Sequence, residues 1–288
     1  MSGERARSIR RVLWVVLGLN LAVAAAKLAV GWRADSLSMV ADGFHSLLDG
    51  SSNVIGLVGM TWATQPPDDD HHYGHHKYEA IAALAIGVLL ALTALEVVRA
   101  GIARFRSPVL PDAGALSLAV MFVTMAVNLA VSRYEGGWGR RLKSELLLAD
   151  SQHTFSDLFV SGSVLAGLAA ARFGVAWADP LIAFVIAAFI VRIAYTVLRQ
   201  VTYTLTDSST LAPDEVCAVA RGVAAVQVCK HVRSRGVPPF LFIDLEIEVD
   251  PALPLGEAHQ IAHRVVDACK AQLHATDVVV HVEPLGGG

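Results

Sequence analysis

Residues 79–104 read EAIAALAIGVLLALTALEVVRAGIAR. This run exceeds the roughly 20 mostly apolar residues that a helix needs to cross the hydrocarbon core of a bilayer. The whole chain of 288 residues agrees with it, because 54% of the residues are hydrophobic and only 17% are charged. Ordinary soluble domains carry about 25% charged residues. The composition excludes a disordered chain, a nucleic-acid-binding protein and a small disulfide scaffold.

Five other stretches have a similar length, so we predict an α-helical polytopic membrane protein with six transmembrane helices. The predicted spans are residues 12–31, 36–63, 79–104, 113–133, 144–172 and 178–203. An even number of spans places both termini on one side, and the larger number of Arg and Lys residues there favours cytoplasmic termini. The basic N-terminus runs into apolar sequence without a cleavage site, which indicates an anchor and not a removed signal peptide. We expect the protein in the cell (inner) membrane.

The sequence changes character near residue 207. Residues 207–288 hold 11 acidic and six basic residues, and their pattern predicts the order helix, strand, strand, helix, strand. Within this segment, residues 240–250 alternate between apolar and mostly acidic positions, as in a half-buried strand with an acidic outer face. We therefore expect a transmembrane domain over residues 1–206 and a C-terminal cytoplasmic α/β domain of order αββαβ over residues 207–288.

Several unusual residues are given ordinary structural roles. Cys217, Cys229 and Cys269 form no C-x-x-C pair and are odd in number, which fits packing roles in a reducing compartment. Lys27, near the end of the first predicted span, is expected to reach the membrane interface with its charged end.

Two predicted spans carry the same polar pattern in their middle. Residues 41–49 read ADGFHSLLD and residues 149–157 read ADSQHTFSD, so the pattern A-D-x-x-H-[ST]-x-x-D occurs twice. Residues four apart lie on one face of a helix. Each helix therefore presents a stripe of carboxylate, imidazole and carboxylate.

Two such stripes that face each other would surround one point with four ligands: His45, Asp49, His153 and Asp157. Four nitrogen and oxygen ligands suit tetrahedral Zn²⁺. The alternative is that these residues only hold helices together. A carboxylate inside the membrane costs at least about 2.5 kcal/mol, which favours a metal site. Asp42 and Asp150 are expected to support it through outer contacts or an access path.

Two further clusters contain metal-binding residue types. Residues 68–77 hold three Asp and four His, and His71 and His75 with an Asp predict a second site. The alternative is a solvated loop that attracts cations weakly. A third cluster in the tail comprises His231, Asp244, His259, His263, His281 and Glu283. Its alternative is a set of surface histidines without metal.

The predicted spans, the doubled motif, the loop PPDDDHHYGHHKYE (66–79) and the tail segment DVVVHVEP (277–284) resemble the cation diffusion facilitator family, in particular its bacterial ferrous-iron and zinc efflux pumps. The resemblance implies a homodimer that exports divalent metal in exchange for protons, with a metallochaperone-like (ferredoxin-like) cytoplasmic domain.

The resemblance also implies site residues. It places the transport site on His45, Asp49, His153 and Asp157, the loop site on Asp68, His71 and His75, and the tail site on His231, Asp244, His259, His281 and Glu283. Lys77 and Asp207 match a charge pair that links loop and tail across the dimer in relatives.

This chain has His45 where close bacterial relatives usually carry Asp, and its two-His, two-Asp set resembles zinc-selective transporters of animals. We therefore expect Zn²⁺ as the main substrate, with Fe²⁺, Co²⁺, Cd²⁺ and Mn²⁺ as alternatives. Relatives often have His where this chain has Asp244. The competing functions are a membrane metal sensor and an intramembrane metalloenzyme. The enzyme is disfavoured because the sequence lacks H-E-x-x-H and four ligands already close a tetrahedron.

Overall fold

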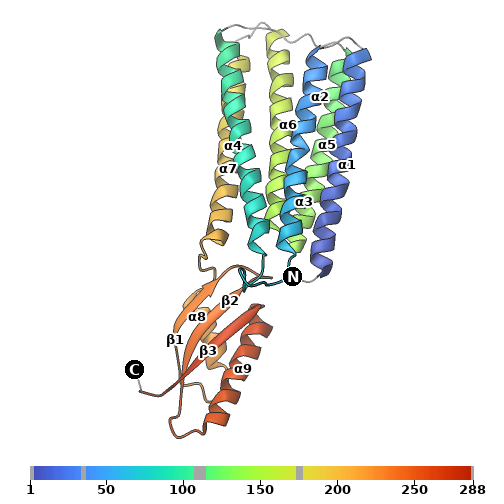
Figure 1. The fold of residues 1–288 in the computed structure, drawn as a ribbon. Coiled ribbons are helices and arrows are strands. Elements are labelled where there is room, and N and C mark those ends of the chain that lie inside the picture. The colour runs from blue at the N-terminus through green and yellow to red at the C-terminus, as the bar shows by residue number, and fades with distance from the viewer. Residues whose placement is uncertain (1–2, 34–36, 107–114, 173–177, 287–288) are drawn as a thin grey trace. The chain divides into compact units, whose positions relative to one another are not determined.

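The computed structural model describes residues 3–33, 37–106, 115–172 and 178–286 (Figure 1). The chain divides into two compact units, Met1–Thr202 and Tyr203–Gly288. The domain boundary that we place between residues 206 and 207 stays a prediction.

The first unit is helical throughout its regular structure. Its helices are α1 (Gly3–Arg33), α2 (Leu37–Asp49), α3 (Ser51–Ala63), α4 (Lys77–Arg106), α5 (Ala115–Leu142), α6 (Glu145–Arg172) and α7 (Ala178–Leu205). Within the described residues, four of these helices (α1, α4, α5 and α7) are long and apolar enough to cross a membrane. Helix α6 has the necessary length but carries the polar motif. The total of six spans therefore stays a prediction.

The segment predicted as a single span over residues 36–63 forms two helices of 13 residues each, separated by Gly50. The backbone hydrogen bonds there are long, with 3.4 Å both from Gly50 N to Ser46 O and from Val54 N to Gly50 O. The Ser52 hydroxyl donates to the carbonyl oxygen of Asp49. The interruption therefore directly follows the last residue of the first polar motif.

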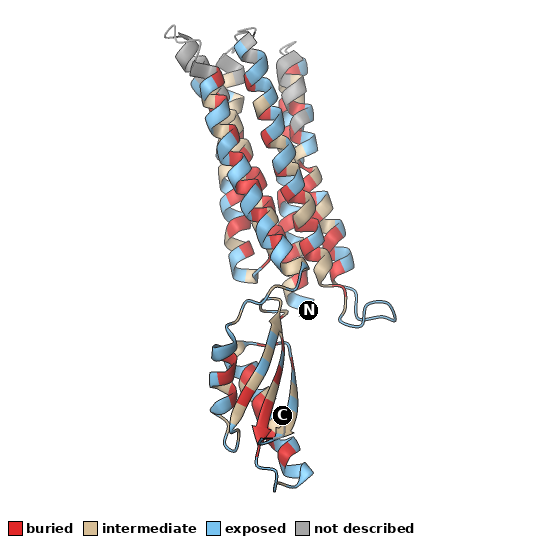
Figure 2. Ribbon diagram, turned by 90° about the vertical axis from the view of Figure 1, so that its left-hand side faces the viewer, coloured by how far each residue is buried: buried red, intermediate tan, exposed pale blue. Residues whose placement is uncertain are grey.

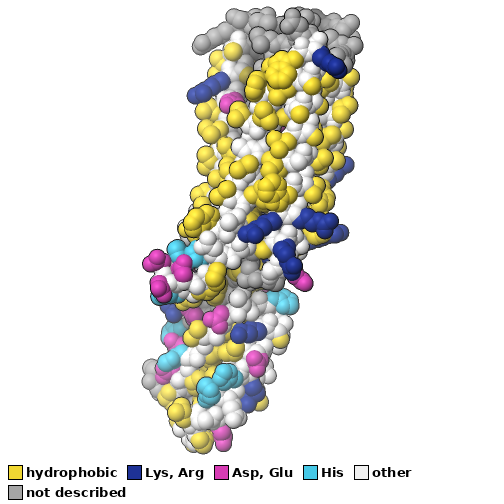
Figure 3. Space-filling view, turned by 45° about the vertical axis from the view of Figure 1, so that its right-hand side comes forward, with side chains coloured by type: hydrophobic (Ala, Val, Ile, Leu, Met, Phe, Trp, Pro, Cys, Tyr) yellow, Lys and Arg dark blue, Asp and Glu magenta, His cyan; other side chains and the backbone are white. Residues whose placement is uncertain are grey.

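The helices bury small and aliphatic side chains against one another and expose large apolar ones. Figure 2 shows buried residues along the faces where the helices meet, and Figure 3 shows hydrophobic side chains over much of the visible outer face of the long helices. Trp14, Leu92, Phe122 and Val185 are among the exposed apolar residues. Such a surface is suited to contact with lipid.

One buried ion pair joins several helices at the end of the bundle where α1 begins. The Arg5 guanidinium donates to both carboxylate oxygens of Glu79, at 2.8 and 3.0 Å, and to the carbonyl oxygen of Leu142. The Ser144 hydroxyl also donates to Glu79. Arg5 and Glu79 expose only 9% and 7% of their side chains. This network ties α1 and α4 to the turn between α5 and α6.

The tail unit has the predicted αββαβ order. Its elements are α8 (Pro213–Arg221), β1 (Val228–Arg235), β2 (Phe242–Val249), α9 (Leu255–Leu273) and β3 (Asp277–Pro284). The sheet order is β1-β2-β3, with β1 antiparallel and β3 parallel to β2. Ile243, Leu245 and Ile247 face a core formed with α8 and α9. The alternate positions of β2 and β3 form the opposite, polar face of the sheet.

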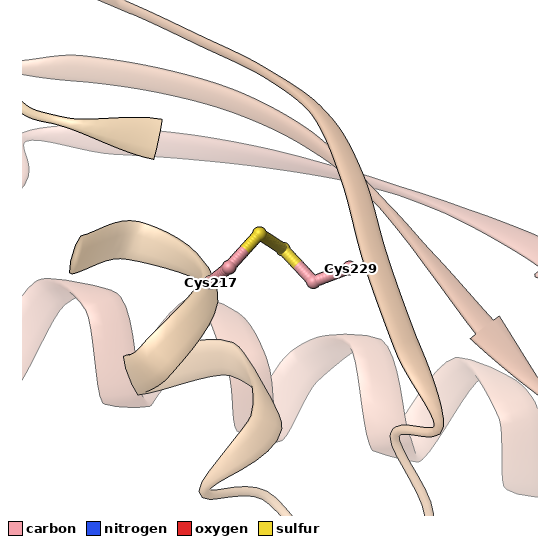
Figure 4. The surroundings of a disulfide bond; sticks show 2 residues. All are labelled: Cys217 and Cys229. Atoms are coloured by element: carbon pink, nitrogen blue, oxygen red, sulfur yellow. A yellow bond between two sulfur atoms is a disulfide. The ribbon is translucent and has the colours of Figure 1, made fainter. Parts of the chain in front are cut away.

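The packing role expected for the cysteines is wrong for two of them. Cys217 of α8 and Cys229 of β1 form a disulfide (Figure 4), whereas Cys269 is buried and free. The two bonded residues are 12 positions apart, and packing of the helix on the strand brings their Cα atoms to 5.4 Å. This separation lies in the ordinary range for a disulfide, but it is a tertiary contact that cysteine spacing does not reveal.

Replacing Gly59 with Ala is expected to destabilise the helical unit. The new Cβ would collide with the Cβ of Ala82 and force α3 away from α4. Such overpacking costs about 1–3 kcal/mol, against a gain of about 0.5–1 kcal/mol for Ala over Gly within a helix. Thermal unfolding of the detergent-solubilised protein should therefore show a lower midpoint for Gly59→Ala.

Gly18→Ala is the matched control, because a Cβ at Gly18 in α1 would meet nothing within 4 Å. Its unfolding midpoint should stay at the wild-type value or rise. Equal midpoints for the two variants would contradict the close packing of α3 on α4.

Candidate metal centres

The first candidate centre joins the end of α2 to the middle of α6. One ligand atom each from Asp49, His153 and Asp157 lies within 4.8 Å of the others. His153 and Asp157 are one turn apart on α6, and Asp49 is the last residue of α2. The structure therefore brings together three of the four predicted ligands. The side chains of His45 and Asp42 lie outside the described residues.

The imidazole of His153 is available to a ligand. The side chain is buried, and its Nδ1 atom has no hydrogen-bond partner among the described residues. The hydroxyl of Ser156, which is fully buried, donates to the carbonyl oxygen of His153. A buried nitrogen without a partner normally costs free energy. Coordination of a metal ion through Nδ1 would remove that cost.

Lys27 does not reach the membrane interface, so this expectation is wrong. The side chain is buried, and its ammonium group donates to the hydroxyl of Ser46 at 2.8 Å. Ser46 lies within the first polar motif, so a basic side chain from α1 packs next to the motif. The sequence does not reveal this contact, because the neighbours of Lys27 along α1 are apolar and its partner Ser46 lies on α2.

Asp150 lies one turn before His153 and is not part of the three-residue group. The amide of Asn53 in α3 donates to one of its carboxylate oxygens, and Asn20 of α1 donates in turn to the amide oxygen of Asn53. The predicted supporting residue is thus buried in a polar network that connects three helices.

The second candidate centre lies in the loop between α3 and α4. Ligand atoms of Asp68, His71 and His75 lie within 4.8 Å of one another. His71 Nδ1 is 3.2 Å and His75 Nε2 is 3.3 Å from the Asp68 carboxylate. His75 is buried, and its Nδ1 is 3.1 Å from the carbonyl oxygen of Pro66. A contact of this kind fixes the ring and directs Nε2 toward a metal.

The Asp68 carboxylate is also held by the loop backbone. It accepts the backbone N–H groups of Asp70 and His71. Partial burial raises the pKa of Asp68 but the hydrogen bonds from His71 and Asp70 lower it, and the net direction is downward. The carboxyl is therefore ionised, as a metal ligand must be.

The predicted tail residues are brought together only in part. His231, His281 and Glu283 lie on the polar face of the sheet, where His281 is 2.6 Å from Glu283. His259 is instead on α9, which packs against the other face, and its Nε2 is 3.1 Å from Nε2 of His263. Within one chain, as far as its residues are described, His259 therefore does not lie next to the other predicted ligands of the tail site.

Glu246, which the sequence did not single out, lies beside His231 in a hollow that Asp244 and His281 also line. His231 Nδ1 is 2.7 Å from the Glu246 carboxylate, and Glu246 is the cross-strand partner of His281. The hydrogen bond from His231 lowers the pKa of Glu246 below its ordinary value. Asp244 is exposed and 3.7 Å from Arg233. The alternation of residues 240–250 already put both acids on this face, but it could not show which one meets His231.

The position of His231 depends on a local irregularity of β1. The register with β2 shifts between Lys230 and Arg233, and His231 has a positive φ of 51°. This bulge turns the imidazole toward β2.

Each of the two units matches a family of known proteins. Residues 13–206 match the family described as the cation efflux transmembrane domain, and residues 211–285 match the cytoplasmic domain of cation efflux proteins. The manganese efflux system protein MneS of Bacillus subtilis is 31% identical over 277 residues, which cover 94% of each chain. The cation-efflux pumps FieF of Cronobacter sakazakii and Pectobacterium atrosepticum are 30% and 29% identical, over 90% of this chain and 87% of theirs.

Glu246→Gln is expected to weaken Zn²⁺ binding by the tail at least about tenfold, because the carboxylate either binds the ion or orients His231. Asp244→Asn is the matched control, since it removes an equal charge from the same face. The measurement is a competition titration of the full-length protein with a chromophoric chelator. Weaker binding in Asp244→Asn than in Glu246→Gln would identify Asp244, the ligand predicted from sequence, as the more important of the two acids.

Proposed function

This chain belongs to the cation diffusion facilitator (cation efflux) family, and from that premise we propose that it exports Zn²⁺ in exchange for protons. Membership makes the protein a membrane-spanning cation efflux transporter that forms homodimers and is not an enzyme. The preference for Zn²⁺ and the coupling to protons go beyond family membership and are what we propose. The observation that carries them is the group of half-buried Asp49, buried His153 and half-buried Asp157, in which one imidazole nitrogen of His153 has no partner among the described residues.

The choice of Zn²⁺ rests on the ligand types. Imidazole and carboxylate together suit Zn²⁺, whereas Mn²⁺ favours sites made of oxygen ligands. We propose His45 as the fourth ligand, because its spacing on α2 repeats that of His153 on α6. One relative is named for manganese efflux, so Mn²⁺ is the competing substrate against which the preference has to be measured.

Proton exchange follows from the same ligands. A metal ion binds neutral imidazole and ionised carboxylate, so its arrival displaces protons. An unperturbed imidazole titrates near pH 6.5, so proton supply on each side of the membrane changes the occupancy of the site. Two conformations that open the site to opposite sides then suffice for net exchange.

The remaining assignments extend this proposal. Asp68, His71 and His75 would bind a second Zn²⁺ in the loop, and the polar face of the tail sheet would bind further Zn²⁺ with structural or regulatory roles. We place both termini in the cytoplasm and the protein in the inner membrane. The charge pair of Lys77 and Asp207 across the dimer is also part of the proposal.

Asp157→Asn is expected to reduce Zn²⁺ transport at least about tenfold, because the centre between α2 and α6 loses a charged ligand. Proteoliposomes loaded with a zinc-sensitive and a pH-sensitive dye measure both fluxes. Asp267→Asn, an exposed change on α9, is the matched control and should transport normally. Zn²⁺ uptake by the wild type without an opposing proton flux would refute the exchange mechanism.

His45→Asp is expected to widen the range of transported metals and to lower the preference for Zn²⁺ over Mn²⁺. The change replaces an imidazole by a carboxylate and makes the ligand set more suitable for Mn²⁺. The measurement is competition between the two metals in the same proteoliposomes. An unchanged ratio of the two transport rates would rule out His45 as the determinant of selectivity.

A further inference from the structure

Two fully buried carboxyl groups face each other beside the intramembrane metal centre. Glu135 lies on α5 and Asp150 on α6, and both have 0% exposure. Their carboxyl groups interact where α5 packs on α6, beside the Thr154 hydroxyl, which lies 3.5 Å from Glu135 Oε2. Neither residue belongs to the group formed by Asp49, His153 and Asp157. The metal site therefore leaves this pair unexplained.

The hydrogen bonding of the pair is incomplete without a proton. Glu135 Oε1 and Asp150 Oδ1 are both buried and have no hydrogen-donating partner among the described residues. An ionised carboxylate only accepts hydrogen bonds, so two ionised groups cannot bond to each other. A single proton between them supplies the missing donor and removes one of two buried negative charges.

The surroundings of the pair consist mainly of neutral donors. Asn53 of α3 donates to Asp150, and the Thr154 hydroxyl of α6 lies 3.5 Å from Glu135 Oε2. Asn20 of α1 lies behind Asn53, and His153 is the next titratable group along α6. The basic residues of α5 on either side, Arg133 and Arg140, are exposed. The contacts described for Glu135 are with Asp150 and Thr154.

Asp150 lies about one helical turn from the metal ligand His153. Asp150 precedes His153 by three residues on α6, and its partner Asn53 follows Asp49 by four residues at the start of α3. One turn of helix is about 5.4 Å. A divalent cation bound about one turn along α6 favours loss of a proton from the pair through its positive charge, and a proton on the pair opposes metal binding.

We propose that Glu135 and Asp150 form a proton-binding site, distinct from the metal ligands, that shares one proton in the metal-free protein and loses it when the neighbouring centre binds metal. The shared proton is a property of the metal-free state alone. The loss of this proton rests on the proposed binding of metal at Asp49, His153 and Asp157.

Infrared spectroscopy of the metal-free, full-length protein tests the shared proton. The wild type at neutral pH should show the carbonyl stretch of a buried protonated carboxylic acid. Glu135→Gln should remove this band, since the amide can donate to Asp150 without a titrating proton, and Asp150→Asn should remove it as well. Glu257→Gln, the same substitution at an exposed position of α9, should leave the band unchanged.

Absence of the band from the wild type, or its persistence in both pair variants, would overturn the proposal. The wild-type spectrum remains decisive even if a variant fails to fold. If the band behaves as expected but proteoliposomes carry no Zn²⁺, the proposed transport function fails and the proton site stands.

Proton release during Zn²⁺ titration in weakly buffered solution tests the coupling. Glu135→Gln should release up to one proton fewer per chain than the wild type, with the largest difference at neutral pH. Equal proton release from the two proteins would show that the pair keeps its proton when metal binds. This result would overturn the proposed coupling between metal binding and proton loss.

Discussion

The cost of placing a carboxylate inside an apolar helical bundle governs the arrangement of this protein. An intramembrane acid costs at least about 2.5 kcal/mol even on the mildest scales, so a buried acid needs a partner, and three contacts between helices supply one here. Glu79 meets Arg5, Asp150 meets Asn53 and Glu135, and Asp49 lies close to His153 and Asp157. The polar contacts therefore determine which helices must be neighbours.

Helix α6 is the element on which these contacts converge. It supplies His153 and Asp157 to the metal centre and Asp150 to the carboxyl pair, and the turn before it contributes Ser144 to the Arg5–Glu79 network. Its neighbours α3, α4 and α5 approach closely through small residues such as Gly136, where a Cβ would meet Ser151 at 2.9 Å. A side chain that separated these helices would disturb the metal centre and the carboxyl pair together.

The features that the sequence predicted well are those with a period or a repeat. Spacings of four residues placed His153 and Asp157 on one helix face, and alternation placed the acids of β2 on the polar face of the sheet. The features it missed are contacts between elements. Register decides that Glu246 and not Asp244 meets His231, and helix packing decides that Cys217 meets Cys229 and that Glu135 meets Asp150. Neither register nor packing leaves a local pattern.

The three candidate centres differ in how far they are prepared for metal. In the loop, the contact of His75 Nδ1 with Pro66 already directs Nε2 toward Asp68. In the bundle, His153 Nδ1 is without a partner among the described residues. In the tail, His231 and His281 are each hydrogen-bonded to a carboxylate. A metal ion there has to replace these bonds, and the displaced carboxylates become the ligands available to complete its coordination.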